Sequence, residues 1–201
     1  MVKNDNIYGD LIDIKNNALE EGIPIMQDDT MDFVNNYIVS SNKKKILEIG
    51  TAVGYSSIMM ALAAPFISIV TIEKDKDRYF KALKNIKKMG LEDRITLIFN
   101  DALEVKLKEK FDLIIIDAAK SKNLEFFKAF ENNLEVNGSI ITDNLSFHGY
   151  VNQDIENISS KNIRGLVRKI RNYIDFLKNN ARYKTKFYDI GDGISVTERR
   201  L

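Results

Sequence analysis

The chain of 201 residues has no cysteine, and this absence excludes a disulfide framework, a thiolate metal site and a cysteine nucleophile. It has only two prolines, Pro24 and Pro65, and no stretch with the composition of a linker. No apolar run approaches the roughly 18 residues that span a membrane, and the amino-terminal sequence MVKNDNIYGD lacks the apolar segment of a signal peptide. We therefore expect a single domain over residues 1–201, located in the cytoplasm and without a membrane partner.

Charge is nearly balanced over the whole chain, with a net charge of +1, but it is unevenly distributed. Residues 1–156 carry 19 basic and 25 acidic side chains, whereas residues 157–201 carry 11 basic and 4 acidic ones. Such a basic quarter is typical of a surface that binds a polyanion such as a nucleic acid. A lysine-rich, solvated helix surface produces the same composition, so charge alone leaves both interpretations open.

Short apolar runs alternate with amphipathic segments, which predicts strands separated by helices. An alternation of this kind is typical of an α/β fold with a mostly parallel sheet and helices on both faces. A Gly-Asp-Gly turn near the carboxyl terminus predicts a final antiparallel hairpin. The expected strands are 45–50, 68–73, 94–100, 111–117 and 139–144, with hairpin arms at 183–190 and 193–200. The expected helices are 55–64, 75–89, 123–134 and about 161–179, preceded by helices within residues 1–40, one of them starting near Asp29 or Thr30.

Polar side chains stand at the end of every expected central strand. In an open α/β sheet, ligands bind beyond the carboxyl ends of the strands. A whole row of acidic and amide side chains at these ends therefore predicts a lined binding site. The residues are Glu48, Glu73, Asn100, Asp101, Asp117, Asp143 and Asn144.

The first strand is followed by a glycine turn with the spacing Gly50-x-x-x-Gly54. It lacks the middle glycine of the dinucleotide fingerprint and the Gly-Lys of a phosphate-binding loop. Glu73 ends the second strand, where an acidic side chain can accept the hydroxyls of a ribose. Because the turn has no basic residue for a pyrophosphate and Glu48 lies close by, S-adenosylmethionine fits better than NAD. A nicotinamide-dependent oxidoreductase, or a nucleotide-binding module without activity, is the alternative from another class.

Four segments together resemble the cation-dependent O-methyltransferases, the family of the catechol and caffeoyl-CoA enzymes. They are LEIGTAVGYSS (47–57), VTIEKD (70–75), FDLIIIDAAK (111–120) and ITDN (141–144). The resemblance implies a class I S-adenosylmethionine-dependent methyltransferase fold, which is Rossmann-like, with six parallel strands and one antiparallel strand in a seven-stranded sheet. Four further segments are similar to the bacterial tRNA 5-hydroxyuridine methyltransferases, which implies tRNA as the partner. These are IPIM (23–26), DNLSFHGYV (143–151), NIRGLVRKI (162–170) and IGDGISV (190–196), while Ser121, Lys122 and Asn123 depart from that pattern.

The resemblance also implies roles for individual residues. Asp117, Asp143 and Asn144 match the metal ligands, and their hard oxygen donors suit Mg²⁺ or Mn²⁺. Lys120 matches the general base, and Asp117 is the second expected catalytic residue. The implied cofactor contacts are Met26, Glu48, Gly50, Ser56, Glu73, Asp101, Ala102 and Asp117.

The acceptor is less closely defined, because a dication that chelates two neighbouring oxygens would serve either of two substrates. One is 5-hydroxyuridine at the wobble position of tRNA, which would become 5-methoxyuridine, and the other is a small catechol-like phenol. Arg164 and Arg168 are candidates for phosphate contacts. The roles of Phe147, His148 and Tyr150 stay open. Phe147 and Tyr150 could stack on a flipped base or simply pack the loop, and the resemblance gives His148 no role as a base or ligand, which favours a plain loop position. The resemblance further implies a homodimer, with residues 6–40 as the candidate interface.

Overall fold

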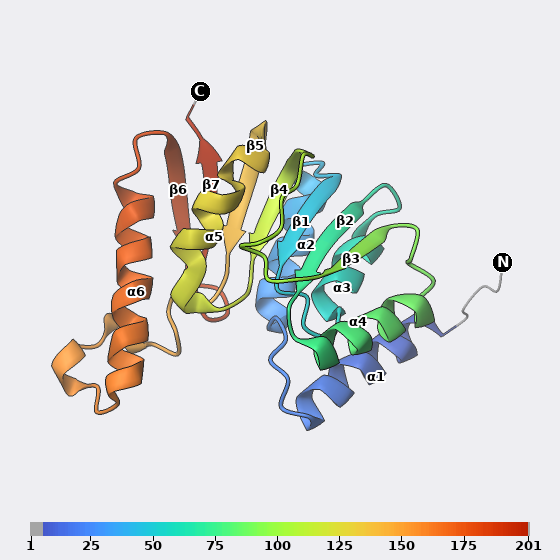
Figure 1. Ribbon diagram of the computed structural model, residues 1–201, viewed down its shortest axis with the longest axis horizontal. Helices are drawn as coiled ribbons and strands as arrows, with labels where there is room; N and C mark the ends of the chain where they lie inside the picture. The colour runs from blue at the N-terminus through green and yellow to red at the C-terminus, as the bar shows by residue number, and fades with distance from the viewer. Residues whose placement is uncertain (1–5, 201) are drawn as a thin grey trace.

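A computed structural model describes residues 6–200 and contains one seven-stranded sheet (Figure 1). The strand order is β3-β2-β1-β4-β5-β7-β6. β7 runs antiparallel to both of its neighbours, and all other adjacent pairs are parallel. The predicted α/β sheet with a carboxyl-terminal antiparallel hairpin is thus confirmed. The strands are β1 (Lys45–Ile49), β2 (Ser68–Glu73), β3 (Ile95–Phe99), β4 (Phe111–Ile116), β5 (Leu134–Thr142), β6 (Tyr183–Tyr188) and β7 (Ile194–Arg199).

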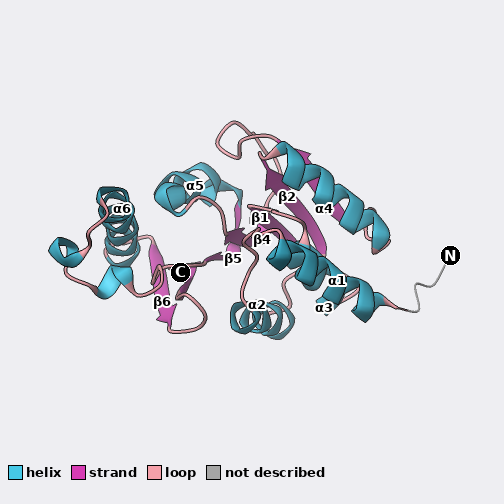
Figure 2. Ribbon diagram, turned by 90° about the horizontal axis from the view of Figure 1, so that it is seen from below, coloured by secondary structure: helices cyan, strands magenta, loops and turns pink. Residues whose placement is uncertain are grey.

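Helices cover both faces of the sheet, as Figure 2 shows for α1 to α3 on one side and α5 and α6 on the other. Asp75 caps α4 by accepting a hydrogen bond of 2.9 Å from the backbone N–H of Arg78. Within residues 6–200, no helix is both long and apolar enough to pass through a lipid bilayer. The helices are α1 (Ile7–Glu20), α2 (Asp28–Ser40), α3 (Tyr55–Ala63), α4 (Lys76–Lys88), α5 (Asn123–Phe130) and α6 (Lys161–Lys178).

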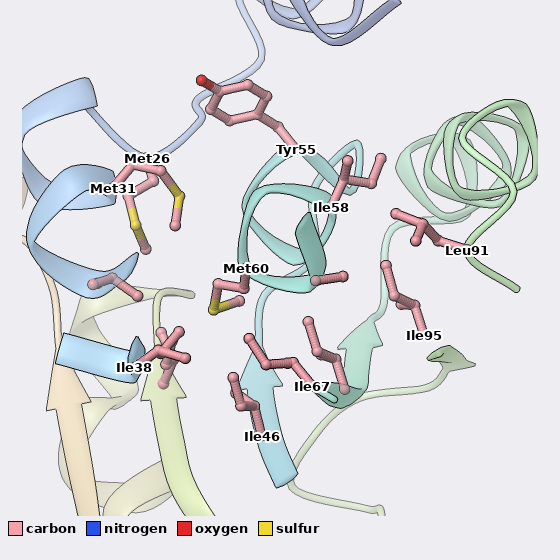
Figure 3. Packing of buried hydrophobic residues seen from close by; sticks show 14 of the residues in the cluster. Met26, Met31, Ile38, Ile46, Tyr55, Ile58, Met60, Ile67, Leu91 and Ile95 are labelled. Carbon is pink, nitrogen blue, oxygen red and sulfur yellow. The ribbon is translucent and has the colours of Figure 1, made fainter. Parts of the chain in front are cut away.

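The core has two halves because successive residues of a strand point to opposite faces of the sheet. Ile46 packs into the half that α1 to α4 cover, and its neighbour Leu47 packs into the half that α5 and α6 cover. Figure 3 shows the first half, where Met31 and Ile38 of α2 lie close to Met60 of α3. Both halves surround a sheet whose central strands β1 and β4 are almost entirely buried, which holds the strand ends rigidly.

The bounds of two neighbouring elements differ from those predicted. The helix expected over 123–134 ends at Phe130, and residues 131–133 form a 3₁₀ turn. The strand expected over 139–144 begins earlier and ends at Thr142, because Leu134 already pairs with Phe111 of β4. The side chain of Asn133 supports this early start by donating hydrogen bonds to the carbonyls of Leu107 and Glu109. Asp143 and Asn144 therefore lie just beyond the strand, at its carboxyl end.

Candidate functional site

A cavity of about 420 Å³ lies at the carboxyl ends of β1, β2, β4 and β5. Every predicted site residue except Glu48 lines it, so side chains from positions 26 to 144 of the chain converge on one space. The lining residues among those predicted are Met26, Gly50, Ser56, Glu73, Asp101, Ala102, Asp117, Lys120, Asp143 and Asn144.

The turn after β1 requires glycine at position 50. Gly50 has a φ of 100°, and a Cβ atom there would lie only 2.1 Å from the carbonyl oxygen of Asp117. Two backbone hydrogen bonds hold the turn between its neighbours, from Gly50 N–H to the carbonyl of Ile72 and from Asp117 N–H to that of Ile49, each 3.0 Å long. The turn after β1 and the end of β4 are therefore in direct backbone contact, which only a residue without a side chain permits.

Glu48 does not reach the cavity, in contrast to its predicted contact with the cofactor. Its carboxylate is fully buried and accepts hydrogen bonds from the hydroxyls of Ser56, Ser57 and Thr71. Burial raises its pKa to about 7, although the three hydroxyl groups act in the opposite direction. Glu48 thus ties β1 to the start of α3 and holds Ser56, which does line the cavity.

Glu73 presents a fixed carboxylate at the end of β2. One of its oxygens accepts the backbone N–H of Ala52 at 2.8 Å, and the other accepts those of Lys74 and Asp75 at 2.9 and 2.8 Å. These contacts join the glycine turn to the end of the second strand. The carboxylate still has unused lone pairs, so it can accept further hydrogen bonds from a ligand in the cavity.

Two carboxylates meet where β4 and β5 end. Ile116 pairs with Thr142, and the N–H of Asp143 donates to the carbonyl of Ile116 at 3.2 Å, so Asp117 and Asp143 emerge side by side. Burial raises the pKa of Asp117, against the opposing charge of Lys120. Burial and then the charge of Asp117 raise the pKa of Asp143 to about 7. A cation between these two groups would relieve their repulsion.

The donor set fits a hard divalent cation. Asn144 follows Asp143 with a left-handed φ of 60°, and its N–H donates to Oδ1 of Asp143 at 2.6 Å. Among residues 6–200, no group of three or more His, Asp or Glu side chains could hold a metal ion. A metal site here would therefore combine two carboxylates with the amide oxygen of Asn144, a set of oxygen ligands suited to Mg²⁺ or Mn²⁺.

The loop after β5 frames one side of the cavity, and His148 lies in the lining. The ring of Phe147 lies 5.6 Å from that of His148 and 5.8 Å from that of Tyr150, and Phe147 also packs against the core half under α5 and α6. Phe147 therefore packs the loop, which is one of the two roles that the sequence left open for it.

Arg164, a candidate for a phosphate contact, already uses part of its guanidinium group within the protein. Its guanidinium group donates to the carbonyls of Ile158 and Ser159, at 2.5 and 3.0 Å. Arg171, one turn of α6 beyond Arg168, likewise donates to the carbonyl of Val151 at 3.0 Å. These two arginines hold the chain that precedes α6, whereas Arg168 is exposed.

Sequence reasoning missed several residues of the cavity lining. Lys74 and Arg78 lie at the end near Glu73 and Asp101, and Lys74 forms an ion pair of 3.7 Å with Asp101. The absence of basic residues from the glycine turn thus does not extend to the rest of the cavity. Lys74 could have been predicted from its position, because it directly follows Glu73, a predicted cofactor contact at the end of a strand. Tyr55 and Phe126 also line the cavity, and the lining includes Asn100, as predicted.

Comparisons with known proteins agree along almost the whole chain. A sequence model of the family described as O-methyltransferase matches residues 7–200. The chain is 29% identical over 175 residues to a caffeoyl-CoA O-methyltransferase of Populus kitakamiensis, and the match covers 83% of this chain and 74% of that protein.

Two crystal structures have a similar fold. One is a candidate caffeoyl-CoA O-methyltransferase from Staphylococcus aureus, with a TM-score of 0.89, 33% identity and coverage of 98% of this chain and 94% of that one. The other is an O-methyltransferase from Bacillus cereus in complex with SAH, with a TM-score of 0.81, 24% identity and coverage of 100% of this chain and 93% of that one.

Proposed function

Since the chain belongs to the O-methyltransferase family, whose members are enzymes, we propose that it transfers a methyl group from S-adenosylmethionine to a hydroxyl held by a divalent cation. The observation that carries this proposal is the convergence of Asp117, Asp143, Asn144 and Lys120 on one cavity with the glycine turn and Glu73. The acceptor that we propose is 5-hydroxyuridine at the wobble position of tRNA.

The cofactor half of the cavity supports S-adenosylmethionine, which supplies the methyl group. Glu73 would accept hydrogen bonds from the ribose hydroxyls, because its carboxylate is held in place by three backbone N–H groups. Gly50 and Ser56 would border the methionine part, which Met26 would cover, and Asp101 and Ala102 would border the adenine. The SAH named with the Bacillus cereus structure is in keeping with this cofactor.

The acceptor half of the cavity supports metal-assisted methyl transfer. Asp117, Asp143 and Asn144 would hold the dication, which would supply the Lewis acidity that lowers the pKa of the acceptor hydroxyl. Lys120 lines the cavity and would take the proton of that hydroxyl. The remaining task of the protein is to hold donor and acceptor close and aligned, which by itself supplies a large part of the acceleration.

The basic carboxyl-terminal quarter supports tRNA as the acceptor. The side chains of Lys161, Arg168 and Lys169 on α6 are exposed, as are those of Lys184 and Lys186 on β6. A small catechol-like phenol is the second candidate, and the name of the Populus kitakamiensis relative favours it. Both acceptors would use the same ligands and the same base, so the catalytic residues do not separate them.

We expect the purified enzyme to methylate total tRNA from a host strain that lacks the gene. Labelled S-adenosylmethionine and Mg²⁺ would be supplied, and nucleoside analysis by mass spectrometry should find 5-methoxyuridine. The double variant Arg168→Glu with Lys169→Glu should bind tRNA more weakly, and the slope of log affinity against log salt should become smaller by about 2, since each phosphate contact contributes roughly 0.9.

The matched control reverses the charges of Lys106 and Lys108, which are also exposed but precede β4, at the opposite end of the strands from the cavity. This control should bind tRNA as the parent does. If the enzyme methylated a catechol but not tRNA, the tRNA proposal would fail and the small phenol would be the acceptor.

A homodimer through residues 6–40 remains our prediction for the assembly. Tyr8, Ile12 and Leu19 share one face of α1 and are 84%, 56% and 58% exposed, which supports an apolar contact there. Sedimentation velocity should give a dimer for the parent and a monomer for Ile12→Asp, and a monomeric parent would contradict the prediction.

A further inference from the structure

The turn between β6 and β7 supports the loop after β5, and Asp192 in this turn makes the central contacts. The carbonyl oxygen of Asp192 accepts the N–H of Ser146 at 2.7 Å, and its side-chain Oδ1 accepts the N–H of His148 at 2.6 Å. The adjacent carbonyl of Gly193 accepts the N–H of Leu145 at 2.8 Å. Three hydrogen bonds thus fasten the loop that carries two residues of the cavity lining, Asn144 and His148.

The loop needs such a support because its backbone is unusual. Asn144, Phe147 and His148 all have left-handed φ values, of 60°, 48° and 54°. Side chains other than glycine rarely adopt this conformation unless the surroundings impose it. The hydrogen bond from His148 to Asp192 acts on one of these three residues directly.

Asp192 is also well placed relative to the acidic pair. It is only 6% exposed, and its Oδ2 atom is buried without a hydrogen-bond partner among the described residues. Its charge is close enough to contribute to the raised pKa of Asp143, after the larger effects of burial and Asp117. A buried carboxylate oxygen without a hydrogen-bond partner costs folding free energy. Its presence therefore points to a role other than stability.

We propose that Asp192 is a positioning residue for the acceptor side of the cavity, which through His148 holds the loop so that Asn144 is ready to bind the cation. This inference rests on the proposed function, because Asn144 is assigned there as a metal ligand. Asp192 does not itself line the cavity, so it acts through the loop and not on the reacting atoms.

The test compares Asp192→Ala with Asp192→Asn in the full chain. Alanine removes the acceptor of the His148 N–H, whereas asparagine keeps an oxygen in that place and removes only the charge. Calorimetry with Mn²⁺ alone should show affinity about tenfold weaker for Asp192→Ala and within about twofold of the parent for Asp192→Asn. Affinity for S-adenosylmethionine should be the same in all three proteins. Asp189→Ala, an exposed residue of the same turn, is the control and should bind Mn²⁺ like the parent.

Mn²⁺ affinity of Asp192→Ala equal to that of the parent overturns the proposal, and so does an equal loss of Mn²⁺ and S-adenosylmethionine affinity. Should Asp192→Ala fail to fold, Asp192→Glu decides in its place, because the longer side chain displaces the carboxylate by one methylene. It should lose Mn²⁺ affinity by about tenfold, and parent-like affinity would again overturn the proposal.

Amide hydrogen exchange separates this inference from the proposed function, since it needs neither metal nor cofactor. Exchange in residues 145–150 should be faster in Asp192→Ala than in the parent, and unchanged in Asp192→Asn. If the parent binds no Mn²⁺, the metal site of the proposed function fails. Unchanged exchange in Asp192→Ala would instead show that Asp192 does not hold the loop.

Discussion

Replacing Asp143 by alanine is expected to reduce methyl transfer at least about 1,000-fold while leaving the affinity for S-adenosylmethionine nearly unchanged. A bound metal ion contributes several kcal/mol to the stabilisation of a transition state, and each 1.36 kcal/mol corresponds to a factor of ten in rate. Asp143 lies at the end of β5, on the side of the cavity away from Glu73 and the turn after β1. Turnover assays and calorimetry with the cofactor measure the two effects separately. Parallel loss of both would place Asp143 in the cofactor site.

A lysine pair distinguishes ion binding from proton transfer. Lys120→Met should lose activity but keep its Mn²⁺ affinity, whereas Lys122→Met, two residues further and outside the cavity lining, should behave like the parent.

The affinity of the parent for Mn²⁺ should fall as the pH drops below about 7, because the pKa of Asp143 is raised to about 7 and a proton then competes with the ion. An affinity that does not change between pH 8 and pH 6 would speak against Asp143 as a ligand.

Gly50→Ala is expected to damage both stability and cofactor binding. The new Cβ atom would lie 2.1 Å from the carbonyl oxygen of Asp117, so the turn and the end of β4 would have to separate. The left-handed backbone and the overpacking together cost about 3 kcal/mol, which lowers Tm by roughly 6–12 °C in a chain of this size. Thermal unfolding and calorimetry with S-adenosylmethionine would measure these losses.

Gly165→Ala is the matched control. Gly165 lies within α6, and apart from its chain neighbours and the backbone of the helix itself, a Cβ atom there meets no atom within 4 Å. Alanine favours a helix over glycine by about 1 kcal/mol, so this variant should be as stable as the parent or more so. Equal stability of Gly50→Ala and the parent would mean that the close approach to Asp117 does not exist in solution.

The positions of the strand ends could be predicted from sequence because apolar runs stop abruptly at polar residues. Ile116 followed by Asp117 is such a stop, and the structure brings Asp117 next to Asp143 as expected. The boundary at Leu134 could not be predicted, because that residue joins the sheet through its pairing with Phe111, which is distant in sequence.

The placement of Glu48 shows a second limit of sequence reasoning. A polar residue near the end of a buried strand can point into a ligand cavity or into the core, and the choice depends on which face of the sheet its side chain occupies. Glu48 shares the face of Ile46, where Ser56 and Ser57 of α3 supply hydroxyl groups. The hydrogen bonds of Arg164 could not be predicted either, since the carbonyls that it binds belong to a loop without a recognisable pattern.

The contacts of Arg164 and Arg171 have a mechanical consequence. They connect α6 to residues 151–159, which continue from the loop that frames one side of the cavity. A large molecule bound to the outer surface of α6 would therefore act on a helix that is hydrogen-bonded to this segment. An acceptor that binds this helix would thereby be coupled to the loop beside the cavity. A substrate small enough to occupy only the cavity would not be.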